Sequence, residues 1–99
     1  SVGIHAAEDG TWLVDGSTHI RDINRTLDWT LPIDGPKTLN GLVLEHLEII
    51  PQQGTSLMID GYTIEITRTA RNAVQTARLK DINVGEEDDS RTDEEATDG

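Results

Sequence analysis

Apolar residues near the N-terminus come in two short runs rather than at a helical period. The runs cover residues 2–5 and 11–14, and the turn-forming sequence Glu8-Asp9-Gly10 lies between them. Runs of this length that are bounded by turn residues are typical of strands. The N-terminal segment is therefore predicted to form two short strands.

Helical spacing replaces the short runs after Asp15-Gly16. One face of a first predicted helix, over residues 18–27, carries Ile20, Ile23 and Leu27. Ser17 or Thr18 is its expected N-cap, because a hydroxyl oxygen there accepts a backbone N–H hydrogen bond. Two prolines and a glycine within residues 31–36 prevent this helix from continuing.

A broader apolar stripe marks a second predicted helix. Thr38 is its expected N-cap, and Pro51 is expected to end it. The stripe consists of Leu39, Leu42, Val43, His46, Leu47 and Ile50. Gly41 costs this helix about 1 kcal/mol of propensity relative to alanine. A residue this small indicates close packing on a sheet or on the first helix.

Alternating residues return in the C-terminal part and predict a hairpin. Residues 56–59 and 62–68 flank Asp60-Gly61, and a two-residue Asp-Gly loop favours a type I′ turn. Tyr62, Ile64 and Ile66 then share one face of the second strand, because side chains alternate along a strand.

A last strand is predicted over residues 73–80, after a turn near residues 70–72. Its alternation is imperfect, since Val74 is out of phase with Ala77 and Leu79. One extra residue on one strand of a pair produces such a change of phase. We therefore expect a β-bulge in this strand pair.

Acidic residues are concentrated at the C-terminus. The chain has 99 residues and a net charge of −11, of which residues 86–99, with eight acids and one arginine, contribute −7. These residues include no large apolar side chain, so we predict a folded domain over residues 1–84 and a disordered acidic tail over residues 85–99. Because the sequence lacks an initiator methionine, we expect it to be part of a longer protein.

The composition also excludes several functions. A net negative charge argues against nucleic-acid binding, which needs a basic surface. The absence of cysteine excludes disulfides, thiolate metal sites and thiol catalysis.

The polar residues form no recognisable catalytic or metal-binding pattern. His5, His19 and His46 lack the regular spacing of a zinc site, so we interpret them as surface or core-flanking residues. Asp15 and Ser17, with His19, offer the residue types of a catalytic triad, but neighbours on a helix cap cannot easily adopt its geometry. No phosphate-binding loop or EF-hand motif is present. The sequence therefore predicts no catalytic and no metal-ligating residue, and it identifies no cofactor-binding residue.

Two further groups of residues allow alternative interpretations. Trp12, Trp29 and Tyr62 are interpreted as packing residues, with ligand stacking by Trp12 or Tyr62 as the alternative. Four bases, Arg68, Arg71, Arg78 and Lys80, are interpreted as solvent-facing residues of the last two strands, with binding of an anion or an acidic partner as the alternative. If a surface carries function, we expect it on the sheet face bearing Thr63, Glu65 and Thr67 and on the basic edge strand.

Several motifs together resemble the CorC/HlyC transporter-associated domain. They are Asp9-Gly-Thr-Trp-Leu-Val-Asp-Gly16, Ile23-Asn24, Thr38-Leu-Asn-Gly-Leu-Val-Leu44, Ile50-Pro51, Gly54, and Asp60-Gly-Tyr62 with Glu65. The resemblance covers residues 2–80. It departs from the family at Ala70-Arg71, where the family often has an Asp-Gly-like turn.

The resemblance implies an α+β fold in which two short helices pack on an antiparallel sheet, similar to the FAD-binding subdomain of PCMH-type flavoproteins. Such domains follow a pair of CBS domains in hemolysin-C-like proteins, many of which also carry a membrane domain. These proteins are associated with magnesium and cobalt efflux. The resemblance implies no catalytic residue and no cofactor.

From this resemblance we expect a non-catalytic regulatory domain that modulates the efflux of divalent cations such as magnesium and cobalt. The alternative is that the domain senses a small molecule, either an adenine nucleotide or a flavin. A role as a hydrolase or toxin component is disfavoured because the sequence has no catalytic pattern. The expected partners are the CBS pair and the membrane domain of the same polypeptide. A homodimer and a weak divalent-cation contact at the acidic tail remain open. The expected location is the cytoplasmic face of the bacterial inner membrane, with the isolated domain soluble.

Overall fold

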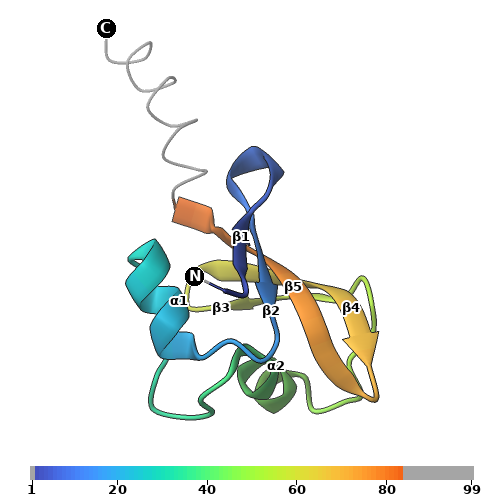
Figure 1. Ribbon diagram of the computed structural model, residues 1–99. Helices are drawn as coiled ribbons and strands as arrows, with labels where there is room; N and C mark the ends of the chain where they lie inside the picture. The colour runs from blue at the N-terminus through green and yellow to red at the C-terminus, as the bar shows by residue number, and fades with distance from the viewer. Residues whose placement is uncertain (1, 84–99) are drawn as a thin grey trace, which may run out of the picture.

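Five antiparallel strands form one sheet, and two helices pack against it (Figure 1). The computed structural model describes residues 2–83. The strands are β1 (Ile4–Ala6), β2 (Trp12–Asp15), β3 (Ser56–Ile59), β4 (Tyr62–Ala70) and β5 (Ala73–Asp81). The helices are α1 (Ile20–Leu27) and α2 (Leu39–Leu47), and a short 3₁₀ turn, η1 (Glu8–Gly10), joins β1 to β2. The predicted α+β class is confirmed.

The predicted acidic tail of residues 85–99 lies outside the described residues. Within residues 2–83, no helix has both the length and the apolar composition needed to cross a membrane.

β5 is the central strand of the sheet, so the prediction of a basic edge strand is wrong. The strand order is β1-β2-β5-β4-β3. β2 pairs along one edge of β5, with Trp12 opposite Leu79 and Val14 opposite Ala77, while β4 pairs along the other edge. The β1–β2 hairpin thus covers one edge of β5. That edge would be free if the strands lay in the sheet in the order of the chain.

Both predicted turns between the C-terminal strands are confirmed. Asp60 and Gly61 have φ values of 50° and 87°, as a type I′ turn requires. Arg71 and Asn72 have φ values of 55° and 65°, so the second hairpin uses the same left-handed geometry without a glycine.

The predicted β-bulge is also present. The register between β4 and β5 shifts on both sides of Arg68, which lies opposite Thr76. Val74 and Ala77 are both buried although they are three residues apart on one strand. The irregularity allows both side chains to face the core.

The two helices begin differently. Thr38 caps α2 as predicted, because its hydroxyl oxygen accepts the Gly41 N–H at 3.1 Å. The prediction of Ser17 or Thr18 as the cap of α1 is wrong: His19 occupies the N-cap position and makes no side-chain cap bond. The first amide of α1, Ile20 N–H, instead donates to the Lys37 carbonyl oxygen at 2.8 Å.

α2 ends earlier than its apolar stripe predicts. Glu48, with φ of 61°, is its left-handed C-cap, and its N–H donates to the Leu44 carbonyl at 3.3 Å. The last helical residue, Leu47, is thus four residues before Pro51, and Ile50 is 59% exposed rather than part of the stripe. His46, also predicted in the stripe, is exposed on the last turn, so it flanks the core as a surface residue. A Cβ on Gly41 would lie 2.9 Å from the Pro36 Cβ, so the close packing predicted there involves a loop.

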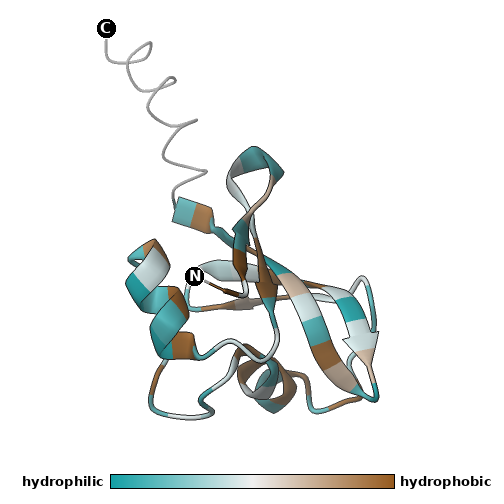
Figure 2. Ribbon diagram, in the orientation of Figure 1, coloured by the Kyte–Doolittle hydropathy of each residue, from teal (hydrophilic) through white to brown (hydrophobic). Residues whose placement is uncertain are grey.

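The core lies between the helices and the sheet face turned toward them, and Figure 2 shows hydrophobic positions recurring on both helices and along the strands. Its members are Ile4, Val14, Ile20, Ile23, Trp29, Leu31, Leu39, Leu42, Val43, Ile59, Tyr62, Ile64, Ile66, Val74, Ala77 and Leu79. The Trp29 and Tyr62 rings stack with centroids 4.5 Å apart, and the Tyr62 hydroxyl accepts the Thr30 N–H at 2.8 Å. Trp12 packs half-buried against the core, so the packing interpretation of the aromatic residues is confirmed.

One junction ties the start of α2 to the sheet. The Asn40 side-chain oxygen accepts the Val74 N–H at 2.7 Å, and the Asn40 N–H donates to the Gly16 carbonyl at 2.8 Å. The Gly16 N–H donates to the Gln75 carbonyl at 2.8 Å. A Cβ on Gly16 would lie 1.9 Å from the Val74 carbonyl oxygen, so only glycine fits this close approach.

Candidate interaction surface

The predicted face of Thr63, Glu65 and Thr67 is the sheet face turned away from the helices. These three residues are half-buried and alternate along β4 with Tyr62, Ile64 and Ile66, which face the core. Across the sheet, Glu65 lies opposite Arg78 of β5 and Ser56 of β3. The prediction therefore identifies one continuous outer face.

Polar groups on this outer face bond largely to one another. Arg78 Nη1 donates to Glu65 Oε1 at 3.2 Å, and the Thr67 and Thr76 hydroxyls lie 2.7 Å apart. The Arg78 and Glu65 side chains are 43% and 42% exposed, and an ion pair this exposed is worth at most about 1 kcal/mol. The outer face thus offers mixed polarity rather than one strong charge.

The four predicted bases do not form one patch. Lys80 lies opposite Thr63, Arg78 opposite Glu65, and Arg68 opposite Thr76, while Arg71 lies in the β4–β5 turn. Their positions therefore extend along the length of the central ladder. Arg78 and Lys80 share the outer face of β5, whereas Arg71 lies at the far end of the hairpin.

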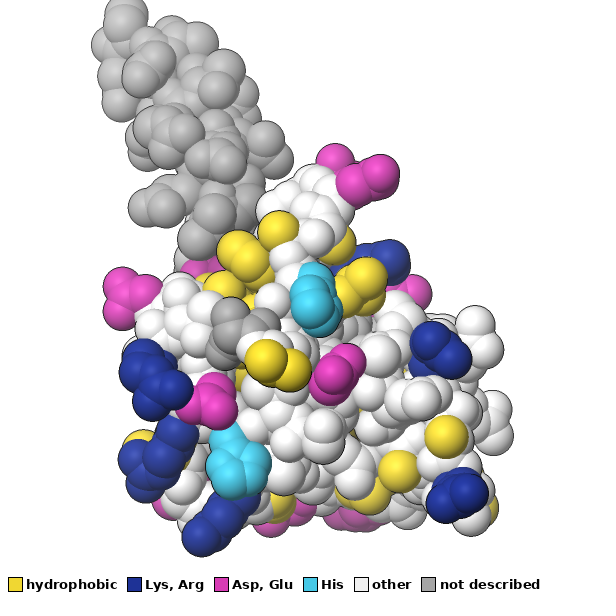
Figure 3. Space-filling view, viewed as in Figure 1, with side chains coloured by type: hydrophobic (Ala, Val, Ile, Leu, Met, Phe, Trp, Pro, Cys, Tyr) yellow, Lys and Arg dark blue, Asp and Glu magenta, His cyan; other side chains and the backbone are white. Residues whose placement is uncertain are grey.

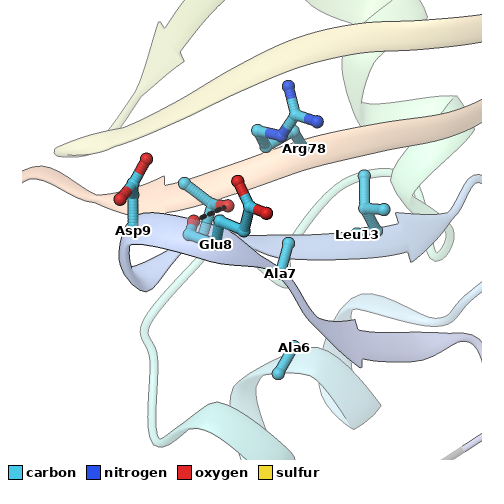
Figure 4. Close-up of a pocket in the computed structure, with 7 residues that line it drawn as sticks. Ala6, Ala7, Glu8, Asp9, Leu13 and Arg78 are labelled. Atoms are coloured by element: carbon cyan, nitrogen blue, oxygen red, sulfur yellow. Dashed lines mark hydrogen bonds between the residues drawn. The ribbon is translucent and has the colours of Figure 1, made fainter.

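A broad cavity of about 540 Å³ lies between the β1–β2 hairpin and β5 (Figure 4). It is lined by Ala6, Ala7, Glu8, Asp9, Thr11, Leu13 and Arg78. Figure 4 shows Glu8 and Asp9 on the hairpin side and Arg78 on the neighbouring strand. Two carboxylates are fewer than the six to eight oxygen ligands that Ca²⁺ takes. Within residues 2–83, no group of three or more metal-ligating side chains gathers here or elsewhere.

The residues with triad chemistry lie in different places. Asp15 and Ser17 line a cavity of about 460 Å³ beside the β4–β5 hairpin, whereas His19 lines a separate cavity of about 220 Å³. His5 lies on β1 and His46 on α2. The structure therefore brings together neither the triad types nor the three histidines.

The cavity at His19 is the feature that sequence reasoning missed. It lies at the start of α1, and its lining residues are His19, Ile20, Arg21, Ile33, Gly35, Pro36 and Lys37. In Figure 3, several Lys and Arg side chains and one histidine gather at the lower left, on the side of α1. No sequence motif joins Arg21 to Lys37, because a loop separates them along the chain.

Taken together, these features define a small α+β domain with a five-stranded antiparallel sheet and several surface cavities. The chain belongs to the transporter-associated domain family CorC_HlyC, whose family model matches residues 5–83.

Proteins similar to this chain come from several bacteria. A UPF0053 protein of Haemophilus influenzae is 42% identical over 71 residues, which are 72% of this chain and 17% of that protein. The inner membrane protein YfjD of Escherichia coli, also UPF0053, is 38% identical over 71 residues, again 72% of this chain and 17% of the relative. This chain thus spans about one sixth of the length of these relatives.

The fold also matches solved structures. A functionally unknown conserved protein from Haemophilus influenzae has a TM-score of 0.75 and 38% identity, covering 79% of this chain and 96% of that chain. More distant sequence relatives include a magnesium and cobalt efflux protein CorC of Buchnera aphidicola, 27% identical over 67 residues and covering 68% of this chain and 23% of that protein. A polyamine export protein of Salmonella typhimurium is 37% identical over 65 residues, covering 64% of this chain and 14% of that protein.

Proposed function

We propose that this chain is a non-catalytic regulatory domain of a larger, CBS-containing membrane protein, and that it modulates the efflux of divalent cations such as magnesium and cobalt. The observation that carries the proposal is the family match over residues 5–83. The relatives are several times longer than this chain, and one of them is named an inner membrane protein.

The names of the relatives favour a regulatory role over direct recognition of the cargo. Similar domains occur in a protein named for magnesium and cobalt efflux and in one named for polyamine export. Metal dications and polyamines share positive charge but differ in size, shape and preferred ligands. A domain common to both is better suited to control a transport step than to select the ion.

The proposed partners are the CBS domain pair and the membrane domain of the same polypeptide, at the cytoplasmic face of the bacterial inner membrane. A second copy of the domain and a weak divalent-cation contact at the acidic tail are further proposed contacts. The outer face of the sheet, with the Glu65–Arg78 pair at its centre, is the proposed docking face for one of these partners.

The proposal is tested by cation efflux in everted vesicles that contain the full-length parent protein. Deletion of residues 2–83 is expected to change the rate or the ligand dependence of efflux while leaving the protein in the membrane. A matched variant with only Glu65 and Arg78 exchanged, Glu65→Arg with Arg78→Glu, should retain the ion pair and the fold but weaken docking. Efflux that is indistinguishable after the deletion would contradict the proposal.

The alternative function is sensing of an adenine nucleotide or a flavin, which the fold expected from the family resemblance suggests. Calorimetric titration of the purified domain with AMP, ATP and FAD separates the two functions. Saturable binding of the whole nucleotide or flavin, with affinity that depends on the base or the isoalloxazine ring, would favour sensing over a docking role.

A further inference from the structure

We propose that the cavity at the start of α1 is a binding site for a phosphate group, with Arg21 and Lys37 as its principal ligands and His19 as a further donor. The cavity measures about 220 Å³ and is lined by all three side chains. This site is additional to the docking role proposed above and does not depend on it.

The fold brings these residues together by joining the two segments that precede the helices. His19 and Thr38 form an isolated antiparallel bridge. The Ile20 N–H donates to the Lys37 carbonyl at 2.8 Å, and the Leu39 N–H donates to the Thr18 carbonyl at 2.9 Å. Backbone hydrogen bonds therefore hold the main chain at Lys37 beside the start of α1, from which Arg21 extends.

The charge at this cavity is opposite to that of the domain as a whole. Residues 2–83 carry eleven acids and seven bases, yet no carboxylate is among the residues that line the cavity. Asp34 stands between the lining residues Ile33 and Gly35 in the loop but does not itself line the cavity. Asp22 pairs with Arg25, and the Glu45 carboxylate approaches Gly35, with Oε1 3.5 Å from the position of a Cβ there. The basic side chains that line the cavity favour an anionic ligand, and the Glu45 carboxylate beside Gly35 offsets part of their charge.

The residue types suit phosphate better than a simple carboxylate. The arginine fork can donate two parallel N–H bonds to phosphate oxygens, and lysine supplies a mobile point charge. Ile33, 47% exposed, and Pro36 add an apolar wall on which the carbon atoms of a phosphoester can lie. A cavity of about 220 Å³ is smaller than typical sites for drug-sized ligands, so we expect a phosphate with its first carbons.

Two sources can supply such a group: a free phosphomonoester, or the headgroup of an anionic phospholipid. The test uses the chain of residues 1–99 and ¹⁵N-HSQC titrations with glycerol 3-phosphate, and it uses co-sedimentation with phosphatidylglycerol vesicles and with phosphatidylcholine vesicles. The site variant is Arg21→Gln with Lys37→Gln. The control variant, Arg68→Gln with Lys80→Gln, removes the same charge from the sheet, and melting curves verify that both variants fold.

We expect saturable shifts at residues 19–21 and 33–37 with glycerol 3-phosphate, weakened at least about tenfold in the site variant and little changed in the control, because a charged fork and a point charge are both lost. Binding to phosphatidylglycerol but not phosphatidylcholine vesicles, lost in the site variant only, would identify the headgroup as the source. Glu45→Gln should strengthen either interaction. If neither ligand shifts these residues, or if both variants weaken binding equally, the site does not exist. Neither the titration nor the co-sedimentation measures efflux, so a negative result in both leaves the proposed regulatory role intact.

Discussion

The side chain of Asn40 is the clearest point at which one substitution should loosen the domain. Its oxygen accepts the Val74 N–H at 2.7 Å, and Val74 is 3% exposed. Asn40→Ala removes this acceptor at the start of α2 and leaves a donor beside the core without its partner. An unsatisfied buried donor costs about 1–3 kcal/mol. Alanine returns a few tenths of a kcal/mol through its better helix propensity.

The expected net loss is therefore about 1–2 kcal/mol in the free energy of unfolding. For a domain of this size, about 1 kcal/mol corresponds to a fall of about 4–8 °C in the melting temperature. Urea unfolding followed by tryptophan fluorescence measures the loss, provided that the m-value is unchanged. Asn40→Asp is the matched control, because its carboxylate keeps an acceptor at the same place and also favours a helix N-terminus.

Hydrogen exchange locates the effect within the domain. In Asn40→Ala, the Val74 amide should lose more protection than amides in the β3–β4 hairpin, since only its own hydrogen bond has been removed. A loss of stability below about 0.5 kcal/mol, or Val74 exchange equal to the parent, would refute the reasoning, because water would then replace the side chain at no net cost.

Three other substitutions test separate parts of the structure. Tyr62→Phe retains the stack on Trp29 but removes the acceptor for the Thr30 N–H, so melting curves should show a loss of about 0.5–1.5 kcal/mol. Gly16→Ala places a methyl group 1.9 Å from the Val74 carbonyl oxygen, and we expect a loss of about 3 kcal/mol or more; wild-type stability in urea would show that the junction can open. Arg71→Asn should raise stability by roughly 0.5 kcal/mol, because asparagine tolerates φ of 55° better than arginine, and an unchanged urea midpoint would contradict this.

Local sequence signals predict the elements that depend on neighbours in the chain. Asp60-Gly61 predicts the β3–β4 hairpin because both residues must adopt positive φ, and they do. The hydroxyl of Thr38 predicts the start of α2 for a similar reason: the Gly41 N–H that it satisfies is only three residues away. The resemblance to the family then predicts two helices on an antiparallel sheet, and the structure has this α+β arrangement.

Three features that the sequence does not predict depend on residues distant in the chain: the central place of β5, the cap of α1 and the basic cavity. β5 is central because Trp12 pairs with Leu79, a contact that no local pattern records. His19 replaces Ser17 or Thr18 as the cap of α1 because the Lys37 carbonyl already accepts the first amide. The same hydrogen bond between Ile20 and Lys37 brings Lys37 to the start of α1, where the basic cavity lies. The wrong prediction of the cap and the missed cavity therefore have the same cause. Both the cap and the cavity depend on pairing between the segment before α1 and the segment before α2.

The hydrogen bond between Ile20 and Lys37 connects the proposed phosphate site to the starts of both helices. Hydrogen exchange can measure whether ligand binding affects them. A phosphate held by Arg21 and Lys37 should stabilise the bridge between them, so hydrogen exchange at the Ile20 and Leu39 amides should slow when glycerol 3-phosphate binds. Exchange in β3, at the far edge of the sheet, should slow less. Equal slowing everywhere would mean that the ligand raises only global stability, as any ligand of the folded state does. Selective slowing would mean that the ligand differs in its contacts with two states of this segment, which regulation of a distant transport step requires.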